Sequence, residues 1–249
     1  MNRASIRRWI AGLAFVAIVL GLVEAQFHLF RKLCGVGPLT QRELAMEYLG
    51  RYLASQYPGK KVVVLANPFS QKSGQPREIY QYEKAGLRGL QRGLGKSVVI
   101  ETVAFAELKP GFVKYPRSVF IDLRTTTPLS YVVTDGALDK IAAAHPQAEL
   151  LVSLIGLPLN VRQTETWKSA NPKKFALLLP DLRMVGDAGA VREAILSGKI
   201  AAFVLNKPGA PADDQPMGED SKMEFDRRFL LVNRDTIDRL LQLYPRLFR

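Results

Sequence analysis

The chain has 249 residues, 47% of them hydrophobic and 23% charged, and a formal net charge of +12. These fractions are those of an ordinary globular protein, so the chain is expected to bury a hydrophobic core of its own. The single cysteine, Cys34, excludes an internal disulfide, so packing alone must hold the fold.

The positive charge favours anionic partners. Lys and Arg are scattered through the chain, often beside acids, as in Arg42-Glu43, and no nucleic-acid-binding motif occurs. We therefore expect a small polar or anionic ligand, or an envelope protein, as the partner, and no nucleic acid.

Residues 1–33 are interpreted as a membrane anchor or signal segment. Arg3, Arg7 and Arg8 precede an uncharged apolar run, Trp9 to Val23. Positive charge followed by an apolar run is typical of a secretory signal or an N-terminal anchor. In either case the positive end stays in the cytoplasm and the rest is exported.

Two interpretations of this segment remain open. A helix over residues 9–30 would be roughly 32 Å long at about 1.5 Å per residue, close to the hydrocarbon thickness of a bilayer. Val23-Glu24-Ala25 instead offers the small residues that a signal peptidase reads. The sequence thus predicts a single-pass membrane protein with its domain outside the cytoplasm, or a periplasmic or secreted protein after cleavage.

The rest of the chain is expected to form a connecting helix over residues 34–60 and one exported α/β domain over residues 61–249. Thr40-Gln41-Arg42-Glu43 is a capping box that begins a helix, and residues 61–66 are a β-branched run typical of a strand buried on both faces. The later pattern predicts helices at 77–94, 136–145 and 187–196, strands at 97–103, 118–122, 149–155, 174–179, 200–205 and 228–232, and a last helix capped by Asn233 or Asp235.

This alternation predicts the fold class: a doubly wound, mostly parallel sheet of the Rossmann-like three-layer kind, preceded by an N-terminal hydrophobic helix. Gly86 and Gly89 fall inside the helix at 77–94 and indicate close packing of that helix on the sheet, not a phosphate loop. Two long loops, 67–76 and 207–222, interrupt the pattern, and the second is expected to be a mobile surface loop.

Open parallel α/β sheets bind ligands beyond the carboxyl ends of their strands. The polar residues that follow the predicted strands are Asn67, Ser70, Asp122, Arg124, Asp181, Arg183 and Asn206. We expect them to form a ligand-binding site, in which the arginines favour an anionic or hydroxyl-rich ligand because a planar guanidinium pairs bidentately with carboxylate or phosphate. The alternative is a set of solvated loops, with a capped turn before Pro128.

Catalytic and metal-binding motifs are missing. The chain has no His-Glu-x-x-His, Cys-x-x-Cys or Gly-x-Ser-x-Gly, and His145 is predicted at the opposite edge from the strand ends. We therefore predict no catalytic residue, no metal and no cofactor. Carboxylate catalysis by Asp122 and Asp181 stays open, because paired carboxylates need no histidine.

The order of elements carries a family resemblance. Ala85-Gly86-Leu87 lies on the helix after the first strand, and Phe229-Leu230-Leu231-Val232-Asn233 precedes an amphipathic helix over residues 236–243. In these features the chain resembles a lobe of the periplasmic binding proteins used by solute importers. The resemblance implies the α/β fold of such a lobe and carries over no binding residue.

Three functions follow from the sequence as hypotheses. The first is a non-enzymatic, membrane-tethered or periplasmic domain that binds a ligand or a partner. The second is a carboxylate-dependent hydrolase, and the third is a structural component of an envelope assembly.

Overall fold

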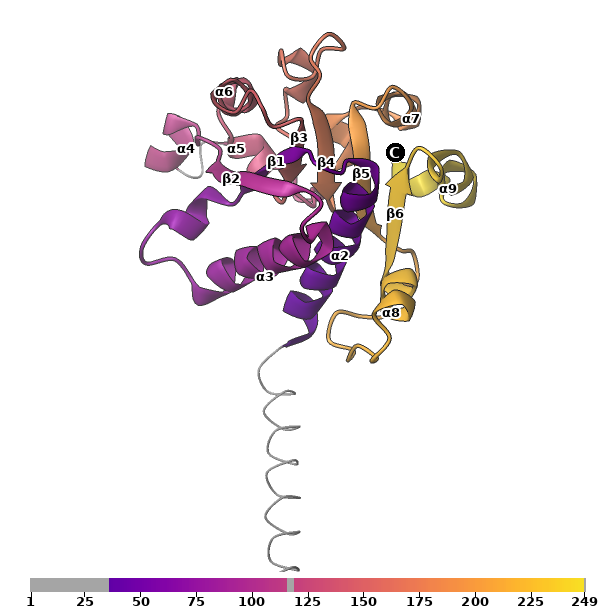
Figure 1. Ribbon diagram of the computed structural model, residues 1–249. Coiled ribbons are helices and arrows are strands. Elements are labelled where there is room, and N and C mark those ends of the chain that lie inside the picture. The colour runs from indigo at the N-terminus through magenta and orange to yellow at the C-terminus, as the bar shows by residue number, and fades with distance from the viewer. Residues whose placement is uncertain (1–35, 116–118, 249) are drawn as a thin grey trace, which may run out of the picture.

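A six-stranded sheet lies at the centre of the molecule (Figure 1). The computed structural model describes residues 36–115 and 119–248. The strands are β1 (Lys61–Ala66), β2 (Val99–Phe105), β3 (Leu150–Ser153), β4 (Lys174–Leu178), β5 (Ile200–Asn206) and β6 (Phe229–Asn233). They lie in the order β2-β1-β3-β4-β5-β6, and all neighbours are parallel except β6, which is antiparallel to β5.

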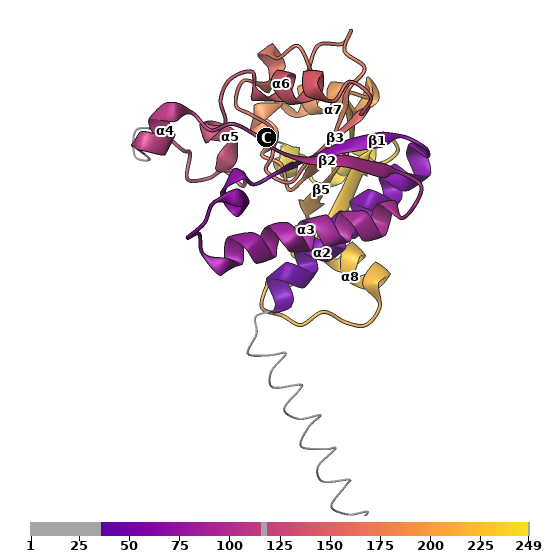
Figure 2. The same ribbon diagram turned by 60° about the vertical axis from the view of Figure 1, so that its left-hand side comes forward.

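Helices cover both faces of the sheet (Figures 1 and 2). One face carries α2 (Val36–Gln56), α3 (Arg77–Leu94) and α8 (Ser221–Arg228), and the other carries α5 (Leu129–Val132), α6 (Ala137–Ala144), α7 (Ala188–Leu196) and α9 (Ile237–Leu243). A short helix, α4 (Pro110–Lys114), and the 3-10 turns Pro68–Gln71, Val161–Gln163, Leu182–Met184 and Pro245–Phe248 complete the elements. This arrangement is the predicted doubly wound fold class.

The sheet separates two hydrophobic cores because side chains of a strand point alternately to its two faces. In β1, Val62 and Val64 pack in the core under α2 and α3, whereas Val63 and Leu65 pack in the core under the opposite helices. All four are buried, which is why this strand reads as a continuous apolar run.

Helix α2 packs against α3 at very short range. A Cβ added to Gly89 would lie 2.0 Å from the carbonyl oxygen of Glu43, and one added to Gly93 would lie 2.1 Å from that of Glu47. Ion pairs flank the contact, with Arg88 Nη2 3.0 Å from Glu43 Oε2. Gly89 therefore permits a close approach of two helices, rather than of a helix to the sheet as the sequence predicted.

The predicted strand at 118–122 is wrong. The described residues from 119 to 122 form no strand, although Val119 and Ile121 pack against the core. Phe120 is 81% exposed. Alternate apolar residues here satisfy core packing without hydrogen-bonding to the sheet, whose edge position is held by β2.

The segment after β5, predicted as a mobile loop, is attached to the domain. Arg228, only 2% exposed, donates from Nη1 to the carbonyl oxygen of Pro211 at 3.3 Å and from Nη2 to that of Gln215 at 3.0 Å. Its Nε lies 3.0 Å from Glu224 Oε2. These bonds hold the segment against α8.

None of the helices in the described part of the chain is long and apolar enough to span a membrane. The apolar segment over residues 9–30 and Cys34 lie outside the described residues.

Candidate functional site at the carboxyl edge of the sheet

The strand order places a topological switch point between β1 and β3. The chain passes from β1 outward to β2, whereas β3, β4 and β5 follow one another in the other direction. Open α/β sheets bind ligands at the carboxyl ends of the strands beside such a point. Two groups of polar residues lie at this edge. We call them the acid–arginine cluster (Asp122, Arg124, Thr125, Asp181 and Arg183) and the switch-point cluster (Arg42, Asn67 and Glu83).

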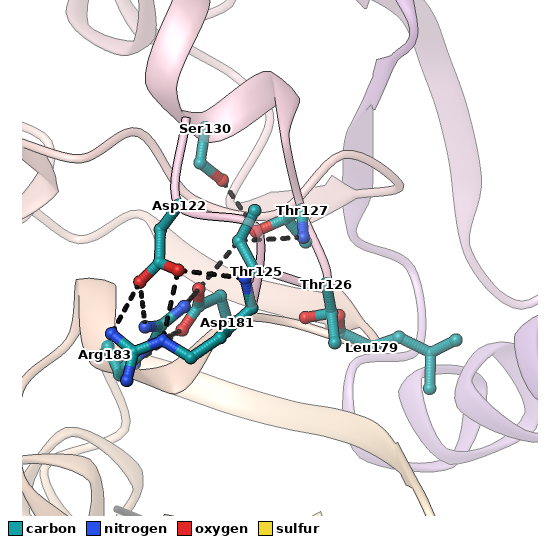
Figure 3. Close-up of polar contacts among 9 residues, drawn as sticks. Asp122, Thr125, Thr126, Thr127, Ser130, Leu179, Asp181 and Arg183 are labelled. Atoms are coloured by element: carbon teal, nitrogen blue, oxygen red, sulfur yellow. Dashed lines mark hydrogen bonds and ion pairs between the residues drawn. The ribbon is translucent and has the colours of Figure 1, made fainter. Parts of the chain in front are cut away.

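Arg183 is the centre of the acid–arginine cluster (Figure 3). Its Nε and Nη2 donate to the two carboxylate oxygens of Asp181 at 2.8 and 2.5 Å, and its Nη1 donates to Asp122 Oδ2 at 2.6 Å. The Asp181 side chain also caps the 3-10 turn after β4 by accepting the backbone N–H of Arg183 at 3.1 Å. One guanidinium thus bridges two carboxylates from separate segments.

The segment over residues 122–127 crosses the carboxyl end of β4. Thr125 Oγ1 donates to Asp181 Oδ2 at 2.7 Å, and Thr126 Oγ1 donates to the carbonyl oxygen of Leu179 at 3.2 Å (Figure 3). Farther along, Thr127 packs on Gly156, where an added Cβ would lie 2.6 Å from Thr127 Cγ2. Asp122 therefore lies at the carboxyl edge of the sheet although the segment that contains it forms no strand.

Arg124 is the exposed member of the cluster. Its Nε and Nη2 donate to the two oxygens of Asp122 at 3.2 and 3.0 Å. The side chain of Arg124 is 84% exposed, compared with 34% for Arg183 and 5% for Asp181. Arg124 is therefore the guanidinium that a ligand in solution meets first.

Electrostatics keep both carboxylates ionised. Hydrogen bonds from Arg124, and then from Arg183, hold the pKa of Asp122 well below its usual range. Burial opposes ionisation of Asp181, but hydrogen bonds from Arg183 and Thr125 outweigh it and lower the pKa of that carboxyl. The hydrogen bonds that Arg183 donates to Asp181, and then to Asp122, raise the pKa of Arg183. Two carboxylates and two guanidinium groups leave the cluster without net charge.

The switch-point cluster joins α2, α3 and the end of β1. Glu83, 5% exposed, accepts the backbone N–H of Asn67 on Oε1 at 2.7 Å. Arg42 donates from Nη2 to the carbonyl oxygen of Leu154, just after β3, at 3.3 Å, and lies 3.5 Å from Glu83 Oε2. Burial raises the pKa of Glu83 and lowers that of Arg42.

Sequence reasoning missed Arg42 and Glu83. The available signal was Glu83 itself, a charged residue on the same helical face as the buried Gly86 and Leu90. Its partner could not be inferred, because Arg42 is 41 residues away on another helix.

The seven residues predicted from the sequence divide between the clusters and their surroundings. Asp122, Arg124, Asp181 and Arg183 are in mutual contact. Asn67 belongs to the switch-point cluster, and Ser70 Oγ donates to its carbonyl oxygen at 2.7 Å. Asn206 is exposed at the end of β5. Parallel strands place Asn67 and Asn206 at the same edge, but neither side chain bonds to the acid–arginine cluster within the described residues.

A cavity of about 460 Å³ lies elsewhere, between α7 and the segment over residues 162–174, and neither cluster lines it. Within residues 36–115 and 119–248, no three His, Cys, Asp or Glu residues are grouped so that they could hold a metal ion.

Comparison with known proteins gives structural likeness only. No family model matches the chain, and no curated sequence matches it. A substrate-binding protein of a sugar ABC transport system from Bordetella parapertussis superposes with a TM-score of 0.38 and 12% identity over 66% of this chain and 41% of its own. A carbohydrate transporter from Acidothermus cellulolyticus in complex with myo-inositol gives 0.43 and 10%, over 84% and 62%.

A solute-binding protein of an ABC transporter from Burkholderia graminis in complex with D-arabinose gives a TM-score of 0.39 and 11% identity, over 77% of this chain and 60% of its own. The chain thus spans less than two thirds of the length of each of these structures. Likeness at this level carries no argument about function. The chain weakly resembles a lobe of these binding proteins.

Proposed function

We propose that the protein is a non-enzymatic binding domain, membrane-tethered or periplasmic, that holds a small polar or anionic ligand at the carboxyl edge of its sheet. The observation that supports this is the Arg183 guanidinium between Asp122 and Asp181, beyond the end of β4. Ligands of open α/β sheets bind at this edge.

The cluster keeps hydrogen-bonding capacity for a ligand. A guanidinium has five N–H donors, and the described partners of Arg183 take three of its side-chain donors. The described partners of Arg124 take two of its side-chain donors. Donors beside carboxylate acceptors suit a ligand with neighbouring hydroxyl groups, and free guanidinium donors suit a carboxylate or phosphate.

The protonation states argue against a carboxylate-dependent hydrolase. A general acid needs a pKa near the working pH, which requires a carboxyl whose pKa is raised. The arginines lower the pKa of Asp122 and Asp181, so both are ionised and weakly basic. The cluster is therefore better suited to ligand binding than to acid–base catalysis.

A protein of the cell envelope is the second candidate partner. Two large apolar side chains close to Asp122 in the chain are exposed: Phe120 at 81% and Leu123 at 99%. Exposed apolar residues gathered on one segment favour a contact surface. Tethering to the membrane rests on the apolar run over residues 9–30.

The proposal is tested by ligand-induced thermal stabilisation of the full chain in a mild detergent. The ligand panel holds monosaccharides, polyols and dicarboxylates. We expect at least one member to raise the melting temperature of the wild type without being chemically altered, and Arg124→Ala to weaken this effect. Arg246→Ala, which removes an exposed arginine from the C-terminal turn, serves as the control. Hydrolysis of a glycoside or ester of a panel member would support the hydrolase instead.

A further inference from the structure

The cavity beside α7 is a second candidate site. Its lining comes from one side of α7 and from the segment that leads through Trp167 into β4. Its volume of about 460 Å³ falls in the range of small-molecule sites, which is about 300–1,000 Å³. None of its lining residues belongs to the acid–arginine or switch-point cluster.

The lining is strongly cationic. Five basic residues and one acid line the cavity: Arg162, Lys168, Lys173, Lys174, Lys199 and Glu193. Lys168 is neutralised from outside the lining by Glu165, whose Oε1 lies 2.5 Å from its Nζ. The remaining charges favour an anion in the cavity.

The ammonium of Lys199 is hydrogen-bonded but is not neutralised by a described carboxylate. Its ammonium donates to backbone carbonyl oxygens, among them those of Asn171 at 2.7 Å and Lys168 at 2.9 Å, and to no carboxylate in the described residues. Burial, and then the neighbouring charge of Lys174, lower the pKa of Lys199. Carbonyl groups satisfy the hydrogen bonds of this ammonium but do not neutralise it, so an anion nearby would be stabilised.

Arg162 and Glu193 are lining residues whose side chains are not engaged in the fold. Both are exposed, and neither side chain makes a hydrogen bond or ion pair with another described residue. The Arg162 guanidinium lies beside Gly186, where an added Cβ would be 3.3 Å from Nη1. Replacing either residue therefore changes the charge of the cavity without breaking a contact that holds the fold.

Trp167 adds an apolar surface to this lining. The ring is partly buried and packs against Phe175 in β4, with ring centroids 5.6 Å apart. A flat apolar group in the cavity could lie against the indole, and an anionic group could bind Arg162.

We propose that the cavity beside α7 binds a small organic anion, with its charged group held by Arg162 and attracted by the charges of the lysines, and its flat apolar part against Trp167. The site is distinct from the one proposed at the carboxyl edge.

The test uses phenyl phosphate as the probe and the emission of Trp167 as the signal. The chain has two tryptophans, so Trp9→Phe leaves Trp167 as the only one in the full chain. We expect a saturable change of emission with phenyl phosphate and a much weaker effect with phenol, which has the same ring without the charge. Arg162→Ala should weaken binding by about tenfold or more, as expected for the loss of a charge-assisted hydrogen bond.

Glu193→Gln should have the opposite effect and tighten binding, because it removes the one acid of the lining. A merely structural role of either residue would not produce opposite changes. Arg77→Ala, at the exposed start of α3, is the control for the loss of one arginine and should leave the affinity unchanged. The proposal is overturned if phenyl phosphate does not bind, if phenol binds as tightly, or if the two cavity variants leave the affinity unchanged.

Discussion

Arg183 Nη1 lies 2.6 Å from Asp122 Oδ2, although 61 positions separate the two residues in the chain. This ion pair joins the irregular segment before α5 to the turn after β4 (Figure 3). Because Arg183 also binds both oxygens of Asp181, its position is fixed from two directions. The pair makes Arg183 a structural as well as a candidate binding residue, so Arg124 is the cleaner residue for tests of ligand binding.

Asp181→Asn should destabilise the protein in a pH-dependent way. The buried carboxylate accepts bonds from Arg183 and Thr125, and we expect its loss to lower the free energy of unfolding by about 1–3 kcal/mol at pH 7. Because folding lowers the pKa of Asp181 below its usual value of about 3.9, the unfolded chain takes up the proton first on acidification. The stabilisation is therefore complete well above pH 4 and is lost as the pH falls below it.

Urea denaturation at several pH values measures this effect. The difference between wild type and Asp181→Asn should shrink from pH 7 to below about pH 4, while Asp214→Asn, in the exposed segment after β5, should match the wild type throughout. A difference that stays constant with pH would contradict the assignment of the stabilisation to the ionised carboxylate.

Gly89→Ala should disrupt the contact between α2 and α3. Its Cβ would lie 2.0 Å from a backbone carbonyl oxygen, which cannot rotate away as a side chain can. Overpacking of this kind costs about 1–3 kcal/mol, occasionally more. Gly189→Ala is the matched control, since its Cβ meets only Asp187 Oδ1 at 3.3 Å. Denaturation followed by circular dichroism should show a loss of stability for the first variant alone.

Arg228→Ala should release the segment over residues 207–220. Removal of Arg228 takes one of two arginine partners from the buried Glu224, with Arg227 remaining, and frees the carbonyl groups of Pro211 and Gln215. Cleavage by proteinase K within this segment should accelerate. Arg227→Ala, which removes the half-exposed partner of the same glutamate, should be cleaved at nearly the wild-type rate. Equal acceleration in both variants would show that the carbonyl contacts of Arg228 are unimportant.

The N-terminal segment gives a prediction that the sequence alone supports. If residues 9–30 form an anchor, the protein should stay in membranes washed with carbonate and keep its N-terminus. Release of a polypeptide that begins near Gln26 would favour the cleaved signal instead. N-terminal sequencing of the exported protein separates these outcomes.

The fold could be predicted from the sequence where a strand is buried on both of its faces. Strand β1 is covered on both faces, so it appears as an uninterrupted apolar run, and helix α3 ends close to its predicted boundary. Residues 119–121 could not be assigned correctly, because two of these apolar residues pack on the core without joining the sheet. The spacing of apolar residues indicates which side chains are buried, but it does not indicate which backbone groups form the hydrogen bonds of a sheet.

Part of the candidate site was predicted from the sequence, but the structure brings its residues together in a different way. Asp122 was placed at the edge as the end of a strand, whereas a crossing segment brings it there through contacts of Thr125 and Thr126. Arg42 could not be placed at all. Its position depends on how closely α2 approaches α3, which the glycines permit but do not specify.

Ligand binding at the acid–arginine cluster is tested most directly by the NMR signals of the arginine Nε–H groups of the full chain. The measurement follows Arg124 and Arg183 during titration with a panel member that stabilises the protein, and Arg246 reports non-specific effects. We predict that the signals of Arg124 and Arg183 shift with one common binding curve while that of Arg246 stays in place. If a ligand binds and neither cluster signal moves, or if no panel member binds, the carboxyl-edge site is contradicted.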